Sequence, residues 1–595
     1  MTTDFAQGCR LLRHVPVTMR DGVCLATTVY LPSEPSRTVG RGLVPRRPLS
    51  ATNAAGGVQA PALQSDPGAE GAYPTILVRT AYNRLPNVGT GWAQQGFAFV
   101  VQDVRGRYGS GGEWYPFTAE AEDGEDTLDW LVAQPWCNGR VGMFGDSYLA
   151  ATQFYAALSG HPALAALNPR FMAGDCWKRA YYCDGVFSLG LTWSWLCFEC
   201  SARTSEAALM PLYDAGGLLR SLPLAEMDVV SGAGVVPWYR DYVTHNRYDE
   251  QWEATNVRQH FDRVRAPMLL IGGWYDYYAG ETFRNFAALG EAAPTEKLRD
   301  AHRLLLGPWT HGLSGSSTLG ELDFGPAALA ENDITERWLR TLLRGGTAAA
   351  VQVAPIRLFV MGANEWRDEW EWPLARTQWQ DWYLRAGGGL SKELPGDEPP
   401  DEYDYDPDHP VQTHGGNHSI GPYNPGLYEL APPGPFDQQE TEARADVLTY
   451  TSAVLTEDTE VTGPITVTLY AASSAPDTDF IARLTDVYPE GRSINITEGV
   501  IRARFREGVW GAPKLMKPGT VYEFTIDLGV TANVFRAGHR LRLVITSSNF
   551  PLWDRNLNTG GDPATETRWQ VARQTILHDA QHPSRVRLPI IPRPS

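Results

Sequence analysis

Apolar runs of strand length recur between residues 74 and 312, with helix-like stretches such as AEDGEDTLDWLVAQ among them. The runs read PTILVRTAY, GFAFVVQDVRG, RVGMFG, PMLLIGGWYD and HRLLLGPWTHG. Such continuous runs are typical of parallel strands, because helices cover both faces of a parallel sheet. The alternation therefore predicts an α/β fold with a parallel sheet, and PIRLFVMG predicts its last strand.

Two segments precede this alternation and a third interrupts it. Residues 14–32 alternate between apolar and polar positions around an Arg-Asp-Gly turn, which predicts two antiparallel strands. Residues 33–73 are dominated by Gly, Pro, Ala and Ser without periodicity, which predicts a long, flexible surface insertion. Residues 171–264 are rich in Trp, Tyr and Leu and have a mostly helical pattern, which predicts an inserted helical cap.

Short alternating strands follow Asn364, among them DVLTYTSAVL, GPITVTLYAASS and HRLRLVITSS. Strands at this spacing predict a β-sandwich or jelly roll, and the Pro-, Gly- and Asp-rich residues 387–435 are interpreted as a linker. We expect three domains, bounded as follows: an α/β core at 1–170 and 265–368, a cap at 171–264, and a β domain at 369–595.

The length and composition describe a globular protein of several domains. At 595 residues the chain is too long for one hydrophobic core, and it is 43% hydrophobic and 20% charged. A formal net charge of -18 argues against nucleic acid or an anionic membrane as the main partner. The N-terminus lacks an apolar leader-like run, and seven cysteines are an odd number, so we expect reduced thiols and a cytoplasmic location.

Two patterns resemble metal sites. Cys176, Cys183, Cys197 and Cys200 gather in an aromatic, apolar region, but the first pair is spaced too widely for a usual zinc knuckle. Buried free thiols are the preferred interpretation. DEYDYDPDH lacks the glycine and the final glutamate of an EF-hand loop, so it is interpreted as a solvated acidic strand edge. We therefore expect neither a metal nor another cofactor.

The stretch RVGMFGDSYLAATQF predicts a nucleophilic serine. A strand ending in MFG and a helix starting near YLAATQF can join at Ser147 only through a sharp turn, which lifts the hydroxyl clear of the sheet. Gly145 supplies the clearance, but Leu149 stands where the Gly-x-Ser-x-Gly pattern has its second glycine. An ordinary turn with a helix-capping serine is the alternative.

A serine hydroxyl needs a base, usually a histidine that a carboxylate orients, in the chain order Ser, Asp/Glu, His. His311 follows a predicted strand after the serine, whereas His302 opens that strand and His161 is too close to the serine's own helix. Asp276 closes the preceding strand. Both candidates therefore fall at strand C-termini, where ligands bind in open α/β sheets, although a structural role stays open for each.

The motifs WCNGRVGMFGDSYLAATQF, GGWYD, GPWTHG and QDVRGRYGSGGEW resemble the cocaine esterase and X-Pro dipeptidyl-peptidase family of CocE/NonD-type hydrolases. GPITVTLYAASSAPDTDFIARLTDVYPEGRS and SSNFPLWDRNLNTGG resemble the jelly-roll domain of that family. The resemblance runs from about His14 to the end, apart from the insertion. It implies an α/β-hydrolase core with an inserted helical cap and a C-terminal β jelly-roll domain.

The resemblance also implies residue roles. Ser147 would be the nucleophile, His311 the base and Asp276 the residue that orients it. The oxyanion hole would use the backbone N–H of Tyr148 and the hydroxyl of Tyr82.

Four further residues are pocket candidates: Tyr181, Trp193, Tyr278 and Asp146. The first three could equally be ordinary cap packing. Asp146 could face the pocket and attract a cation, or point into the core and be hydrogen-bonded there, which we favour. Ala150 also departs from the family pattern Gly-x-Ser-Tyr-x-Gly, in which a glycine stands at its position.

These observations predict a serine hydrolase that cleaves carboxylic esters of small molecules through an acyl-enzyme. The first alternative is an amidase, a peptidase or a β-lactam acylase of the X-Pro dipeptidyl-peptidase or α-amino-acid ester hydrolase type, for which Asp146 or Glu199 could bind a free amino group. The second is a carbohydrate- or partner-binding protein with an idle hydrolase core. Acyl specificity, alcohol specificity and oligomeric state stay open at this point, and a homodimer is compatible with the sequence.

Overall fold

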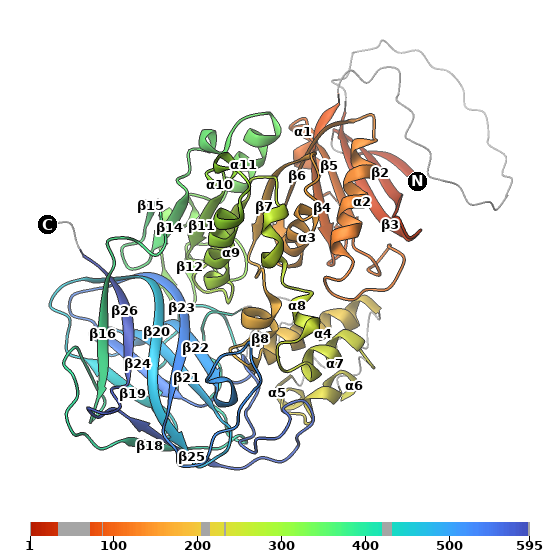
Figure 1. Ribbon diagram of the computed structural model, residues 1–595. Coiled ribbons are helices and arrows are strands. Elements are labelled where there is room, and N and C mark those ends of the chain that lie inside the picture. The colour runs from red at the N-terminus through yellow and green to blue at the C-terminus, as the bar shows by residue number, and fades with distance from the viewer. Residues whose placement is uncertain are drawn as a thin grey trace, which may run out of the picture. The chain divides into compact units, whose positions relative to one another are not determined.

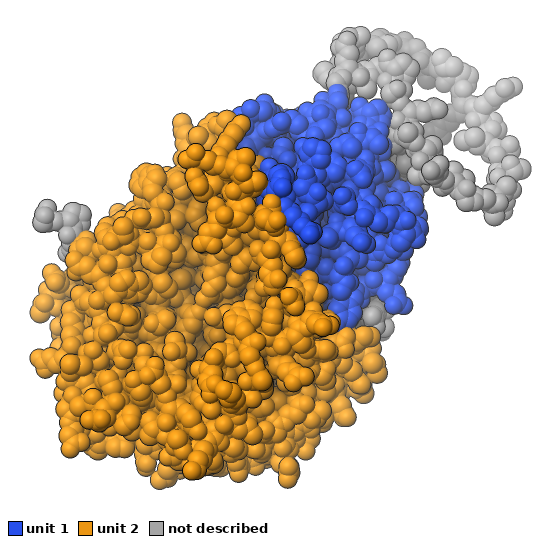
Figure 2. Space-filling view, in the orientation of Figure 1, with its two compact units in different colours: residues 1–167, 263–266, 339–346 blue, residues 168–262, 267–338, 347–595 orange. Residues whose placement is uncertain are grey.

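The computed structural model describes residues 2–6, 8–33, 72–85, 87–203, 215–230, 234–418 and 431–592. Almost all of the predicted insertion at 33–73 lies outside these residues. The chain divides into two compact units, coloured separately in Figure 2. Unit 1 comprises residues 1–167, 263–266 and 339–346, and unit 2 comprises residues 168–262, 267–338 and 347–595.

Unit 1 holds strands in the order β1-β2-β3-β5-β4-β6. β2 and β3 form the predicted antiparallel pair, which turns at Gly22 with a φ of +88°. β4 pairs in parallel with both β5 and β6, as the apolar runs predict (Figure 1). The bounds are β1 Thr2–Ala6, β2 Cys9–Thr18, β3 Cys24–Pro32, β4 Tyr73–Thr80, β5 Ala98–Asp103 and β6 Cys137–Asp146.

The described part of unit 1 includes the helices α1 Thr90–Gln94, α2 Glu120–Val132 and α3 Tyr148–Ala157. The first turn of α2 is acidic, which suits the positive end of a helix dipole. α2 packs closely on α3, because a Cβ added at Gly124 would lie 3.0 Å from the Cβ of Ala156. Small residues thus bring the helix before β6 against the helix that follows it.

Unit 2 contains the other α/β elements of the chain. β10 pairs in parallel with β11, β11 in parallel with β14, and β15 adds an antiparallel edge strand. β7 begins in unit 1 and ends in unit 2, where its last residue pairs with β10, and α11 begins in unit 2 and ends in unit 1. The bounds are β7 Leu164–Arg170, β10 Leu269–Gly273, α9 Ala279–Ala292, α10 Glu296–Arg299, β11 Arg303–Gly307, β12 Thr318–Leu319, β13 Leu322–Asp323, α11 Ile334–Leu343, β14 Ile356–Val360 and β15 Glu365–Glu369.

The region after β7 is mostly helical, as predicted. Its elements are β8 Tyr182–Cys183, β9 Val186–Phe187, α4 Leu189–Arg203, α5 Ala215–Leu218, α6 Met227–Val230, α7 Pro237–Thr244 and α8 Glu250–Glu253. Packed aromatic rings hold it together, with Trp252 in contact with Trp177, Tyr182 and Tyr242. No helix in the described part of the chain is long and apolar enough to cross a bilayer.

The C-terminal residues form an eleven-stranded sheet whose pairs are antiparallel, apart from β17 with β19. Its order is β18-β25-β20-β26-β16-β17-β19-β24-β21-β22, with β23 paired to β20. The bounds are β16 Gln378–Arg385, β17 Gly389–Ser391, β18 Asp401–Tyr405, α13 Gln439–Glu442, β19 Leu448–Ser452, β20 Thr459–Ser473, β21 Asp479–Val487, β22 Ser493–Arg502, β23 Tyr522–Phe535, β24 Arg540–Thr546, β25 Ala572–Leu577 and β26 Arg585–Ile591.

Residues 387–435 are not simply a linker. β17 and β18 both lie in this segment and join the sheet, so the prediction was wrong for them. The sequence does not reveal these strands for two reasons. β17 is only three residues long, and β18 lies at a sheet edge, where charged side chains can face water and replace the usual apolar pattern. The expected acidic strand edge in DEYDYDPDH is β18 itself.

Candidate active site

Ser147 lies on a strained turn between β6 and α3. Its φ of 59° and ψ of -123° are unusual for a residue with a side chain, and it is buried. A Cβ added at Gly145 would overlap the side chain of Leu149, so a glycine is required there. Leu149, which stands at the second glycine position of the Gly-x-Ser-x-Gly pattern, therefore packs against Gly145, which occupies the first. This backbone is the strand-to-helix turn that the sequence predicts.

The Tyr82 hydroxyl lies beside the serine and donates a hydrogen bond to Ser147 Oγ over 3.3 Å. Tyr82 follows the C-terminus of β4 and Ser147 follows that of β6, and the two strands pair in parallel. Their C-termini therefore reach the same edge of the sheet. The backbone N–H of Tyr82 donates to Thr80 Oγ1 at 2.9 Å, which fixes the start of this loop. A phenolic donor thus meets the serine within unit 1.

The side chain of Tyr148 is anchored in a buried polar network. Its hydroxyl donates to Glu120 Oε1 at 2.6 Å and accepts from Trp114 Nε1 at 3.3 Å. Glu120 forms an ion pair of 2.8 Å with Arg79. Burial raises the pKa of Glu120, and Arg79 opposes that rise. The network holds the first turn of α3, which carries the Tyr148 amide.

Unit 2 brings Asp276 and His311 together. Asp276 follows β10 and His311 follows β11, and His311 Nδ1 lies 3.0 Å from Asp276 Oδ1. Asp276 is only 1% exposed, and this burial raises its pKa, which the His311 imidazole opposes. A Cβ added at Gly273 would overlap the backbone of Trp309, so the close approach of the two loops requires this glycine.

Two aromatic rings flank the imidazole. The Tyr278 ring centroid lies 5.5 Å from that of His311, and the Phe171 centroid lies 6.0 Å away. Burial raises the pKa of Tyr278 well above its ordinary value, and the neighbouring hydroxyls of Tyr277 and Tyr181 add to the rise. The imidazole is therefore flanked by apolar ring surface in unit 2.

The other pocket candidates are placed differently. Tyr181 and Trp193 are both buried, and Tyr181 packs edge-on against Tyr242 at 4.5 Å. Asp146 is half-buried at the end of β6. The pocket roles of these residues stay predictions. The Glu199 side chain lies outside the described residues.

Two features of the site were missed from the sequence. Phe171 is one, and its position directly after the apolar strand LAALNPR is a signal that could have found it. The other is the Glu120 network. An acidic helix start has the same sequence pattern whether it is buried or exposed to water, so no signal in the sequence could have found this network. Among the described residues, no group of three His, Cys, Asp or Glu side chains could hold a metal ion.

The chain is similar to known proteins over most of its length. Residues 21–313 match the X-Pro dipeptidyl-peptidase (S15 family), and residues 349–587 match the X-Pro dipeptidyl-peptidase C-terminal non-catalytic domain. A cocaine esterase from Rhodococcus sp. (strain MB1 Bresler) is 38% identical over 566 residues, which cover 89% of this chain and 95% of that protein.

Two solved structures are similar over nearly the whole chain. An aminopeptidase from the marine sediment archaeon Thaumarchaeota archaeon has a TM-score of 0.81 and 25% identity, covering 98% of this chain and 97% of its own. An α-amino acid ester hydrolase has a TM-score of 0.78 and 24% identity, covering 99% and 98%. The second likeness concerns the fold alone.

The family match and the 38% identity to a cocaine esterase show that this protein is a serine hydrolase of carboxylic esters. The chain belongs to the cocaine esterase and X-Pro dipeptidyl-peptidase (S15) family.

Proposed function

We propose that the protein cleaves carboxylic esters of small molecules through an acyl-enzyme on Ser147. His311 takes the Ser147 proton as Oγ attacks the ester carbonyl, and Asp276 holds the imidazole and stabilises its charged form. The leaving alcohol departs with the proton from His311, and water then repeats the sequence. The observation that carries this proposal is the Tyr82 hydroxyl 3.3 Å from Ser147 Oγ on a strained turn.

The tetrahedral intermediate places a negative charge on the former carbonyl oxygen. The Tyr82 hydroxyl and the Tyr148 N–H are proposed as the two donors to this oxygen. The Tyr148 network supports this role, because Glu120 and Trp114 hold the residue whose amide would donate. A donor fixed before the reaction needs no reorganisation when the charge develops.

An uncharged or cationic small ester is the proposed substrate class. The net charge of -18 and the rings of Tyr278 and Phe171 beside His311 support it, as does the similarity to a cocaine esterase. Hydrolysis of amides or peptides is the second candidate. The match to the X-Pro dipeptidyl-peptidase family and the aminopeptidase neighbour favour it.

A substrate panel separates the two candidates. p-Nitrophenyl esters of increasing acyl length are compared with prolyl and α-aminoacyl p-nitroanilides, with the Ser147→Ala variant as the blank. We expect kcat/KM to be higher for the best ester than for any anilide, because an amine leaves less readily than p-nitrophenolate and needs a proton. A preference for the anilides would replace the ester proposal by the peptidase one.

The oxyanion role of Tyr82 has its own test. Tyr82→Phe is expected to lower kcat about 10²- to 10³-fold with little change in KM, because the donor acts mainly on the transition state. A boronic acid that mimics the tetrahedral intermediate should lose affinity in parallel. Tyr108→Phe, at an exposed tyrosine of the same unit, is the matched control. A Tyr82→Phe enzyme with kcat within about twofold of wild type would exclude the role.

We also propose the finer architecture. The α/β elements would be an α/β-hydrolase core at 1–170 and 265–368, the helical region at 171–264 its cap, and 369–595 a jelly roll. The parallel pairing of β4 with β6 and of β10 with β11, and the antiparallel C-terminal sheet, support these assignments.

A cytoplasmic location is proposed from the thiols. Among the described residues, Cys9, Cys24, Cys137, Cys176 and Cys183 form no disulfide, and reduced thiols are typical of the cytosol. Burial raises the pKa of Cys183 to about 12, so this thiol is inert. The side chains of Cys197 and Cys200 lie outside the described residues.

A further inference from the structure

The loop that carries Asp276 is short and is held by its backbone. It joins β10 to α9 through residues 274–278. Trp274 N donates to Gly307 O at 2.9 Å, and Tyr275 N donates to Trp309 O at 3.0 Å. These bonds tie the loop to the segment that leads to His311. They leave the Trp274 carbonyl and the Tyr275 hydroxyl to other partners.

Both of those groups bond to the C-terminal region. Asn417 Nδ2 donates to the Trp274 carbonyl, and the Tyr275 hydroxyl donates to the carbonyl of Asn495 at 3.2 Å. Trp274 is 1% exposed and Tyr275 is 0% exposed, so the loop side of both bonds is shielded from water. Two residues from the region that matches the non-catalytic domain thus reach the residues directly before Asp276.

The backbone next to Asn417 is held by hydrogen bonds and by packing against a buried side chain. Gly416 and Gly434 exchange two backbone hydrogen bonds of 2.8 and 3.0 Å. A Cβ added at Gly416 would overlap the carboxylate of Glu498, so this backbone lies directly against that side chain. Arg483 and Asn549 each hold the same carboxylate at 2.9 Å. Asn417 therefore cannot shift without disturbing a buried ion pair.

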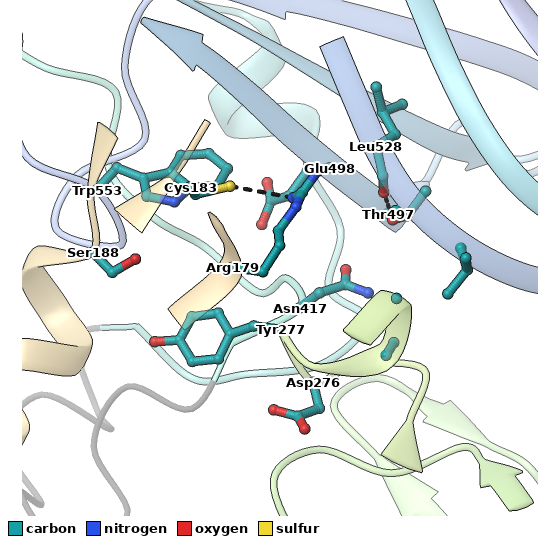
Figure 3. Close-up of a pocket in the computed structure, with 14 residues that line it drawn as sticks. Arg179, Cys183, Ser188, Asp276, Tyr277, Asn417, Thr497, Glu498, Leu528 and Trp553 are labelled. Atoms are coloured by element: carbon teal, nitrogen blue, oxygen red, sulfur yellow. Dashed lines mark hydrogen bonds between the residues drawn. The ribbon is translucent and has the colours of Figure 1, made fainter. Parts of the chain in front are cut away.

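Trp274 and Tyr275 pack into a buried hydrophobic cluster, but a small cavity lies beside Asp276 itself. The cavity has a volume of about 40 Å³ and is lined by Asp276, Tyr277, Asn417, Glu498 and Arg179, among others. Figure 3 shows Arg179 from the helical region, Glu498 from a C-terminal strand and Asn417 gathered near Tyr277 of the loop. Packing is therefore incomplete on this side of the loop, and the two hydrogen bonds add to what holds Asp276 in place.

We propose that the C-terminal region positions the acid of the catalytic triad, with Asn417 as the main positioning residue and the Tyr275–Asn495 bond as its second point. The two bonds hold the loop so that Asp276 stays 3.0 Å from His311. This inference rests on the proposed function, because it gives Asp276 its role. It assigns catalytic consequence to a region whose family description is non-catalytic.

Asn417→Ala in the full-length protein tests the proposal. Without the bond to Trp274, Asp276 moves away from the imidazole, so kcat for a p-nitrophenyl ester should fall about 10- to 100-fold while KM stays unchanged. The acid limb of the pH profile of kcat/KM should move to lower pH, because a more distant carboxylate stabilises the imidazolium less. Tyr275→Phe should show the same changes at smaller size.

Asn556→Ala is the matched control. Asn556 is a buried asparagine of the C-terminal region, whereas Asn417 is half-buried, and the Asn556 amide donates to Asp477 and Asp479 instead. It should keep the kcat and the acid limb of the wild type. A purely structural role of Asn417 would lower thermal stability and leave the acid limb in place, and that outcome overturns the proposal.

The remaining outcomes are also decisive. If Asn417→Ala does not fold, Tyr275→Phe decides: a moved acid limb supports the proposal and an unmoved one overturns it. Wild-type kcat and acid limb in a folded Asn417→Ala protein overturn it too. A wild-type protein that neither hydrolyses esters nor reacts with a fluorophosphonate would instead refute the proposed function.

Discussion

Ser147→Ala is expected to lower kcat for ester hydrolysis by about 10⁴- to 10⁶-fold, since it removes the oxygen that we propose as the nucleophile. KM and the thermal unfolding midpoint should change little, because alanine keeps the backbone and the small volume of the buried side chain. Residual turnover would come from the donors that stabilise the oxyanion. Steady-state kinetics with a p-nitrophenyl ester measure the effect, and a variant that keeps a tenth of the wild-type kcat would contradict a nucleophilic Ser147.

Ser147→Gly separates catalysis from strain at the same position. With φ at 59°, the wild-type backbone stores strain that typically costs about 1–3 kcal/mol in a residue with a side chain. The glycine variant should be inactive yet unfold at a higher denaturant concentration than Ser147→Ala. A glycine variant less stable than the alanine one would show that the turn is not strained.

Asp276→Asn is expected to lower kcat by about 10⁴-fold with little effect on KM. An asparagine keeps the shape of the side chain, but its amide can donate to His311 Nδ1 and favour the wrong imidazole tautomer. It also removes the charge that stabilises the imidazolium. Steady-state kinetics are the measurement, and a kcat within tenfold of wild type would remove Asp276 from the triad.

The same substitution has a stability effect of known sign. Burial raises the pKa of Asp276 above its ordinary value of 3.8, so the folded protein binds this proton more tightly than the unfolded chain does. Protonated Asp276 therefore adds to the free energy of unfolding of the wild type. This contribution is complete below pH 3.8 and is lost as the pH rises through the raised pKa. The asparagine side chain does not ionise, so the Asp276→Asn variant should be at least as stable as wild type at about pH 7–8.

Urea unfolding at about pH 4 and about pH 8 measures this difference. Asp323→Asn is the control of opposite sign, because the N–H of Gly325 lowers the pKa of the exposed Asp323 carboxyl. That variant should lose stability above the ordinary pKa of the carboxyl. An Asp276→Asn protein that is less stable than wild type at the higher pH would contradict the account of Asp276 as a destabilising buried charge.

The sequence was sufficient to predict the position of a site residue where that residue follows the end of a single strand. Asp276 and His311 could be predicted because each closely follows a fully apolar run, and parallel strands place their C-termini at one edge. Ser147 could be predicted because a glycine two positions earlier marks a turn that only a small residue permits. Within its own unit, each predicted triad residue lies where its strand ends. The catalytic roles themselves remain proposals.

Partners distant in sequence could not be predicted. Glu120 begins an acidic helix and has the pattern of a solvated surface, yet it is 3% exposed because Arg79 from β4 and Tyr148 from α3 meet it. Asn417 lies in a segment interpreted as a linker, and only the fold brings it to the carbonyl of Trp274. Such contacts depend on tertiary packing, which leaves no local period in the sequence.

The central claim is that the Ser147 oxygen becomes acylated, and mass spectrometry of the labelled protein tests it most directly. After reaction with a fluorophosphonate, intact-mass analysis should show one adduct per chain, and peptide mapping should place it on Ser147. The Ser147→Ala protein should stay unlabelled. Folded, full-length wild-type protein that takes no label, or carries its adduct on another residue, would contradict the account.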